Sequence, residues 1–290
     1  MQAAGTDGTH GRTSAFARPG HPYLAHWGLV EPPFLLDPDL RFRFEGEDHR
    51  EGLARLLFGL TQLGGIVMVT GEIGAGKTLL AATLADMLAE GDVRIAAVAN
   101  PPRTAAALLG ALVESLEGEP VRRTAARQAV RIREHAAAEV AEGRRLVLLV
   151  DEAQRLDARA LDELRMLTNP GEGPSVAVVL LGQPELSGRV ARQPQVAQRV
   201  VVRHHLGPME EAEVEAYIAH RTRVAGAGRR IFSKRAARAV HAESGGVPRL
   251  VNLLCANALF VAYARGEDVI GEDTVRDLAD DRRRLDGVEG

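Results

Sequence analysis

Residues Gly71 to Thr78 read GEIGAGKT and match the pattern GxxxxGK[ST]. The segment follows the apolar run Ile66–Thr70 and precedes a helical pattern that begins at Leu79. Glycines let a loop curl until successive backbone N–H groups point at phosphate oxygens, and the start of the next helix adds the positive end of its dipole. The spacing therefore predicts a phosphate-binding loop and a nucleotide ligand.

We expect the side chains of this loop to differ in their contributions. Lys77 would hold the β- and γ-phosphates as a compact charge, and Thr78 would offer its hydroxyl to Mg²⁺. The expected cofactors are therefore ATP and Mg²⁺. A chance glycine turn is the alternative, and the strand–loop–helix context argues against it. The rest of the expected nucleotide-binding set is Gly71, Glu72, Ile73, Gly74, Ala75, Gly76 and Leu79.

A second chemical element is the pair of carboxylates Asp151 and Glu152, which follows the apolar run Leu146–Val150. Ligands of open α/β sheets bind at the carboxyl edge of the strands, so a buried strand would deliver both carboxylates beside the phosphate loop. We expect Asp151 to hold Mg²⁺, partly through water, and Glu152 to orient and polarise the attacking water. This pattern predicts ATP hydrolysis. The alternative is an aspartate that caps the following helix.

Short apolar runs alternate with longer amphipathic stretches around these residues. Runs without alternation are typical of strands buried on both faces of a parallel sheet. The predicted strands are Ile66–Thr70, Val93–Ala99, Leu146–Val150, Val176–Leu181 and Val200–Arg203. The predicted helices between them are Leu79–Glu90, Thr104–Leu116, Arg122–Glu142 and Ala158–Leu167. Repeated strand–helix–strand units predict an α/β fold with a five-stranded parallel sheet between layers of helices.

The pattern changes after Leu206, where Gly207 and Pro208 interrupt the chain. Beyond them we expect only helices, at Glu210–Ala225, Lys234–Ser244, Pro248–Ala264 and Glu272–Arg284. The expected domains are a disordered tail at 1–22, a nucleotide-binding core with an entry segment at 23–207, a small all-α lid at 208–285 and a tail at 286–290.

The composition excludes several classes of protein. Of the 290 residues, 46% are hydrophobic and 26% are charged, which is a globular composition. A net charge of −3 disfavours a generally basic nucleic-acid surface. The single cysteine, Cys255, excludes an intrachain disulfide. The sequence has neither an apolar segment of about 18 residues nor a secretory signal, so we expect a cytoplasmic chain without membrane insertion.

Five segments together carry a resemblance to a known family. GEIGAGKT, LVLLVDEAQRL, VVLLGQPEL, AQRVVVRHHLGPM and GGVPRLVNLLCANAL resemble AAA+ ATPases of the general secretion pathway protein A type (GspA/ExeA). The entry segment, WGLVEPPFLLDPDLRF followed by HREGLARLLFGL, is similar to that family's N-terminal signature, and the resemblance covers residues 23–285. In family terms the two chemical elements above are Walker A and Walker B. Related AAA+ proteins that regulate transposition share much of the pattern.

The resemblance implies roles for two further residues. Gln183, at the end of the fourth predicted strand, matches sensor 1, from which a polar group can reach the γ-phosphate or the attacking water. The alternative is a turn residue before Pro184. Arg249, at a helix start, matches sensor 2, which would couple the lid to the nucleotide state. The alternative there is an exposed arginine without a ligand.

The resemblance also implies an arginine that reaches the nucleotide of a neighbouring subunit. Arg199 stands at the expected place, just before the fifth predicted strand, and Arg192 and Arg203 are rivals. Such an arginine can raise the rate by roughly 10³ to 10⁵. A surface ion pair is the alternative. If one of them acts in trans, the active enzyme is a homo-oligomer.

Four residues of the entry segment allow two interpretations. Trp27, Pro32, Pro33 and Phe34 would either wall the adenine pocket or form a hydrophobic staple that ties the N-terminal arm to the core.

The sequence departs from the secretion protein in one respect. It ends at Gly290 without the membrane segment and the peptidoglycan-binding region that follow the ATPase in that family. The expectation is a stand-alone ATPase or the soluble half of a two-protein system.

The expected function is an ATPase that drives or licenses assembly of an unidentified protein partner, of secretion or envelope type. One alternative is an ATP-dependent DNA-bound regulator of a transposition-like system, which the acidic charge does not favour. The other is a nucleotide-gated scaffold with negligible turnover, and the intact pair Asp151-Glu152 argues against it.

Overall fold

The computed structural model describes residues 22–89, 91–120, 123–169 and 176–285. They form two compact units. One is Pro38–Pro208, and the other combines the described parts of Met1–Asp37 and Met209–Gly290. The predicted tails lie outside the described residues, except Pro22, which begins a short helix, α1 (Pro22–Trp27). The predicted helix ends Glu90 and Arg122 also lie outside them.

The unit Pro38–Pro208 contains a parallel sheet in the order β2-β3-β4-β1-β5. Its strands are β1 (Ile66–Gly71), β2 (Val93–Val98), β3 (Arg145–Val150), β4 (Ala177–Gly182) and β5 (Val200–Leu206). All five predicted strands are confirmed, and β5 continues to Leu206, beyond its predicted end at Arg203. Because every strand runs in the same direction, the residues that follow β1, β3 and β4 meet at one edge of the sheet.

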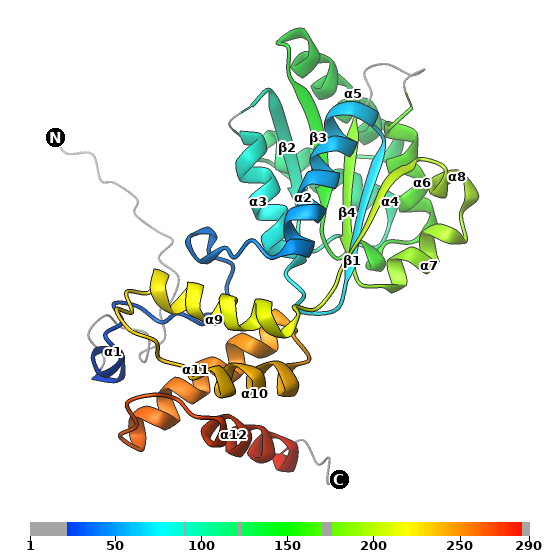
Figure 1. The fold of residues 1–290 in the computed structure, drawn as a ribbon. Coiled ribbons are helices and arrows are strands. Elements are labelled where there is room, and N and C mark those ends of the chain that lie inside the picture. Colours follow the sequence, from blue (N-terminus) through cyan, green and yellow to red (C-terminus); the bar gives the residue numbers. More distant parts are fainter. Residues whose placement is uncertain (1–21, 90, 121–122, 170–175, 286–290) are drawn as a thin grey trace, which may run out of the picture. The chain divides into compact units, whose positions relative to one another are not determined.

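Helices cover both faces of this sheet (Figure 1). The elements of the unit, besides the strands, are η2 (Leu40–Phe42), α2 (Glu47–Phe58), the π-helical turn η3 (Gly59–Leu63), α3 (Lys77–Ala89), α4 (Ala105–Glu117), α5 (Ala125–Ala141), η4 (Ala153–Arg155), α6 (Ala158–Leu167), α7 (Glu185–Ala191) and α8 (Pro194–Ala197). The sequence patterns predict neither α2 nor α7 nor α8 as helices, because these helices are short or interrupted by glycine.

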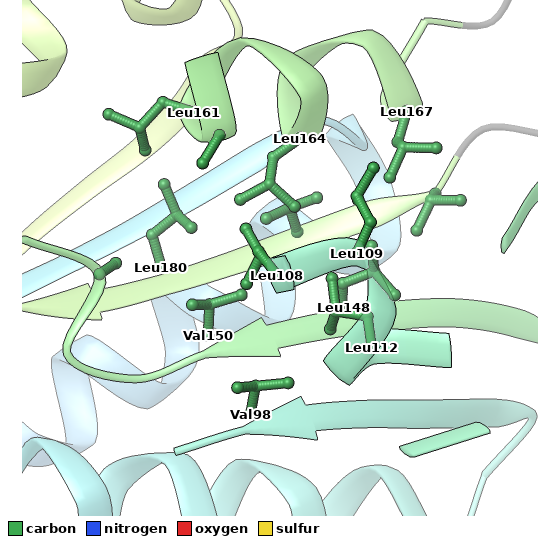
Figure 2. Close-up of a cluster of buried hydrophobic side chains, with 14 of the residues drawn as sticks. Val98, Leu108, Leu109, Leu112, Leu148, Val150, Leu161, Leu164, Leu167 and Leu180 are labelled. Carbon is green, nitrogen blue, oxygen red and sulfur yellow. The ribbon is translucent and has the colours of Figure 1, made fainter. Parts of the chain in front are cut away.

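The core is divided by the sheet into two apolar layers. Ile66 and Met68 of β1 belong to one layer and Val67 and Val69 to the other, as the period of two in a strand requires. Figure 2 shows the first layer, in which leucines of α4 and α6 pack against the strand side chains Leu148, Val150 and Leu180. This packing holds the strand ends of the site in place.

The expectation that every strand is buried on both faces is wrong for the edge strand β5. The sequence predicts strands buried on both faces, yet Val201 and Arg203 are exposed while His204 and Leu206 are buried. The physical reason is that β5 has only one strand neighbour, and helix α2 packs along one of its faces. The central strands β1 and β4 are buried throughout, as predicted.

The second unit is helical. Besides α1 it contains α9 (Glu211–Val224), α10 (Lys234–Ser244), α11 (Pro248–Ala264) and α12 (Glu272–Leu285). None of the helices among the described residues combines the length and the apolar character that a membrane span requires.

Residues 22–37, which include the first part of the entry segment, belong to this helical unit, whereas the entry segment from Pro38 on belongs to the unit of the sheet. The predicted core began at residue 23. The indole N–H of Trp27 donates to the carbonyl oxygen of Leu259 at 2.9 Å, and the Arg221 guanidinium donates to the carbonyl oxygen of Pro33 at 2.6 Å. Phe34 meets another aromatic ring edge-on and is buried, as are Trp27 and Pro33. These contacts favour the interpretation that these residues anchor the N-terminal arm over the interpretation that they wall the adenine pocket. The arm is anchored on the C-terminal helices.

Candidate nucleotide site

The loop between β1 and α3 has the backbone that its sequence predicts. Gly74 and Gly76 have φ angles of 83° and 100°, in the region that side chains disfavour. Helix α3 begins at Lys77, so the backbone N–H groups of its first turn have no helical acceptors of their own. A turn of this shape at a helix N-terminus suits an anionic group.

Lys77 is folded back into this loop. Its side chain is 6% exposed, and Nζ donates to the carbonyl oxygens of Gly71 and Glu72 at 2.8 and 2.9 Å. Burial lowers the pKa of Lys77, while the nearby carboxylates of Glu152 and Asp151 act in the opposite direction. The ammonium group is thus partly desolvated inside the loop, where it would attract an anion more strongly than in water.

Asp151 connects the phosphate loop to β3. Its Oδ2 accepts a hydrogen bond of 2.8 Å from the Thr78 hydroxyl, and its Oδ1 accepts one of 2.8 Å from the backbone N–H of Glu152. The carboxylate therefore does not cap the next helix, α6, whose N-cap is Asp157. The side chains of Thr78 and Asp151 are thus in direct contact, and their role in holding Mg²⁺ stays a prediction.

The oxygens of Thr78 and Asp151 fit a magnesium ion. Mg²⁺ prefers oxygen ligands and is usually held by one or two carboxylates together with substrate phosphates. Within the described ranges no group of three or more His, Cys, Asp or Glu side chains could hold a metal ion by itself. An ion at this place would therefore take its remaining ligands from the nucleotide and from water.

Glu152, the residue after Asp151, has an uncommon backbone conformation. Its φ of 53° is the only positive φ among the described residues that are not glycine. The left-handed region costs a side-chain-bearing residue free energy and is found disproportionately at functional sites. The carboxylate oxygen Oε2 accepts a hydrogen bond of 2.7 Å from Nε2 of Gln154.

Gln183 lies directly after β4, between the strands that carry the two elements above. In the sheet β4 separates β3 from β1, so its end lies between Asp151 and the phosphate loop. The backbone N–H of Gln183 donates to Oε1 of Gln154 at 3.1 Å, and its carbonyl oxygen accepts from Leu186 in a turn. Gln183 thus forms the turn of the alternative interpretation, and its predicted role as sensor 1 stays a prediction.

The three candidate trans arginines have different surroundings. Arg199 is half-buried, and its guanidinium donates to Oδ1 of Asn169 at 2.8 Å. Its carbonyl oxygen accepts from the N–H of Ile66, at the amino end of β1. Arg199 therefore lies at the sheet edge opposite the phosphate loop of its own subunit. Arg192, at the end of α7, and Arg203, on β5, are exposed.

Arg249 belongs to the helical unit. It is an exposed residue in the first turn of α11, directly after Pro248. Its predicted role as sensor 2 stays a prediction.

Sequence reasoning missed one residue of the site, Gln154. The motif DEAQ contains it, but its role depends on hydrogen bonds to residues 152 and 183, which no spacing rule predicts.

Comparisons with known proteins agree with this geometry. Residues 60–190 match the model of the AAA domain. General secretion pathway protein A of Aeromonas hydrophila is 42% identical over 255 residues, which are 86% of this chain and 46% of that protein. The chain thus spans about half the length of this curated relative.

Solved structures share the fold. Cdc6p of Pyrobaculum aerophilum has a TM-score of 0.68 at 17% identity, over 83% of this chain and 70% of that one. The ORC2 protein of Aeropyrum pernix, solved as ADPNP–ADP complexes, has a TM-score of 0.60 at 22% identity, over 80% of this chain and 65% of that one. At these identities the likeness shows the fold alone. The matched domain and the 42% identity together show that the chain contains an AAA domain and is related to general secretion pathway protein A.

Proposed function

We propose that this chain binds Mg-ATP at Gly71–Thr78 and hydrolyses it. The observation that carries the proposal is the 2.8 Å hydrogen bond between Thr78 and Asp151, because it brings the oxygens suited to Mg²⁺ directly beside the phosphate loop. The bound metal would neutralise charge on the phosphates. Lys77 binds the β- and γ-phosphates, Thr78 and Asp151 hold the metal, and Glu152 orients and polarises the attacking water.

The remaining proposed residues respond to the γ-phosphate. Gln183 contacts it or the attacking water, and Arg249 reports its presence to the helical unit. Arg199 supplies its charge to the site of a neighbouring subunit, with Arg192 and Arg203 as rivals. The position of Arg199 at the amino edge of the sheet supports action in trans, since its own phosphate loop lies at the other edge. The active form is then a homo-oligomer.

We propose that ATP hydrolysis drives or licenses assembly of a protein partner of secretion or envelope type. This step is supported by the 42% identity to a protein named for the general secretion pathway. Loss of the γ-phosphate would release Gln183, Arg249 and the neighbour's arginine together, so hydrolysis would loosen the contact between subunits.

Direct measurement of the dissociation constant for ATP tests the binding part of the proposal. Lys77→Ala weakens ATP binding about ten- to a hundredfold, because a charge-assisted contact is worth about 1.5–3 kcal/mol. Lys234→Ala is the matched control, since Lys234 is the only other lysine of the chain and is exposed at the start of α10. Equal ATP affinity in the two variants would contradict the assignment of Lys77.

Light scattering of the Glu152→Gln variant tests the assembly part. ATP-dependent oligomers without DNA are the expected result. Oligomers only with duplex DNA would favour the transposition-type regulator, and a monomer under every condition would contradict the shared site.

A further inference from the structure

Gln154 is hydrogen-bonded at both ends of its side-chain amide. Nε2 donates to Oε2 of Glu152 at 2.7 Å, and Oε1 accepts from the backbone N–H of Gln183 at 3.1 Å. Glu152 follows β3 and Gln183 follows β4, and these two strands are neighbours in the sheet. One side chain therefore connects the ends of two strands at the nucleotide site.

The chemistry of the two partners fixes the orientation of this amide. A carboxylate only accepts hydrogen bonds and a backbone N–H only donates them. A flipped amide would place its NH₂ group against the N–H of Gln183 and its oxygen against the carboxylate of Glu152, so both contacts would become repulsive. Glutamine at position 154 supplies a donor and an acceptor together, and neither glutamate nor methionine can replace both.

The surroundings hold Gln154 closely. A Cβ atom at Gly182 would lie 2.7 Å from Oε1 of Gln154, so a larger residue there would displace the amide from its present position. Ala153, directly before Gln154, and Leu156, two residues after it, are fully buried. The bridge thus starts from η4 and ends on the backbone of Gln183, directly after the buried strand β4.

Glu152 depends on this bridge for its position. Its backbone is in the left-handed region, and in the described part of the chain the bond from Gln154 is the only hydrogen bond to its carboxylate. Without Gln154, nothing that the structure shows would stop the carboxylate from rotating away from the phosphate loop.

We propose that Gln154 is a positioning residue for ATP hydrolysis, which holds the carboxylate of Glu152 and couples it to the backbone of Gln183. The inference rests on the proposed function, because it assigns a helper to the base of that reaction. A movement of Gln183 on contact with the γ-phosphate would pass through its N–H to Gln154 and from there to the carboxylate.

Two variants distinguish the two hydrogen bonds of the Gln154 side chain. Gln154→Met keeps the length of the side chain and removes both hydrogen bonds. Gln154→Glu keeps an acceptor for the N–H of Gln183 but replaces the donor to Glu152 with a like charge. Gln62→Met is the matched control, because Gln62 is exposed in η3 at the amino end of the sheet.

The first experiment measures kcat and KM for ATP. Both Gln154 variants are expected to lower kcat about ten- to a hundredfold, the loss that a displacement of about 1 Å can cause. KM and the directly measured Kd for ATP are expected to stay within about twofold in Gln154→Met, which removes no phosphate contact and adds no charge. A merely structural role would lower ATP affinity and thermal stability together. Values of kcat within about twofold of wild type in both variants would overturn the proposal.

The second experiment does not depend on ATPase activity. Amide hydrogen exchange at Gln183 is expected to accelerate in Gln154→Met and to keep its wild-type rate in Gln154→Glu, because only methionine removes the acceptor. Unchanged exchange in Gln154→Met would overturn the bridge itself. A wild-type protein that hydrolyses no ATP would overturn the proposed function and the positioning role with it, while the exchange rates would still show whether the bridge forms.

Discussion

The hydroxyl of Thr78 donates a hydrogen bond of 2.8 Å to Oδ2 of Asp151 across 73 residues of sequence. Thr78 lies in the first turn of α3 and Asp151 directly after β3, and β4 runs between β3 and β1 in the sheet. The contact therefore spans the end of the intervening strand. Gln183, which follows that strand, therefore lies between the phosphate loop and the acidic pair.

The Thr78–Asp151 contact predicts a change in magnesium dependence. Thr78→Val keeps the shape of the side chain and removes the hydroxyl, so it removes one proposed metal ligand. The half-saturating Mg²⁺ concentration for ATP hydrolysis is expected to rise about tenfold, which corresponds to about 1.4 kcal/mol. Titration of Mg²⁺ at fixed ATP checks this. Thr61→Val, at an exposed position of η3, is the control, and an unchanged titration in Thr78→Val would argue against a metal role.

The close packing of Gly52 against His204 predicts opposite effects of the same substitution at two helical glycines. A Cβ atom at Gly52, in α2, would lie 2.7 Å from two atoms of the buried imidazole of His204. Gly52→Ala is therefore expected to lower the free energy of unfolding by about 1–3 kcal/mol, despite the better helix propensity of alanine.

Gly188, in α7, supplies the comparison, since nothing lies within 4 Å of a Cβ atom built there. Gly188→Ala is expected to raise the free energy of unfolding by about 0.4–1 kcal/mol. Urea denaturation of both variants measures the difference. A Gly52→Ala protein as stable as Gly188→Ala would show that His204 moves aside freely.

The surroundings of His49 predict a loss of stability toward acid. Burial lowers the pKa of His49 below 6.5, with Arg43 and His204 adding to this shift and Glu45 and Asp48 opposing it. As the pH falls below 6.5, the unfolded chain binds a proton that the folded chain does not, so the free energy of unfolding decreases until the folded pKa is passed.

Replacement of His49 by glutamine removes this contribution. The decrease in urea midpoint between pH 7.5 and pH 5.5 is expected to be smaller in His49→Gln than in wild type. The exposed His205 provides the control variant, His205→Gln, which leaves the burial of His49 intact. If His49→Gln shows the full wild-type decrease, the acid sensitivity arises elsewhere.

The sequence was informative wherever a function depends on a local run of residues. The apolar runs predicted all five strands, and the loop pattern predicted a curled glycine loop and the start of α3 to within two residues. The meeting of Thr78 with Asp151 followed from the rule that parallel strands share a carboxyl edge.

Contacts between distant residues could not be predicted in this way. The hydrogen bond from Trp27 to the carbonyl oxygen of Leu259 joins residues 232 positions apart, and no local pattern indicated that the residues before Pro38 pack on the C-terminal helices. The bridge through Gln154 depends on the direction of one amide and on the missing side chain at Gly182. Neither property leaves a periodic signal in the sequence.

The measurement that tests the central claim most directly is phosphate release from Mg-ATP by wild type and by Glu152→Gln, together with ATP binding by both. Glutamine keeps the size of the side chain and cannot accept a proton from water. The account predicts steady hydrolysis by wild type, a rate about 10²- to 10⁴-fold lower in Glu152→Gln, and unchanged ATP affinity. Equal rates in the two proteins, or no hydrolysis by wild type, would contradict it.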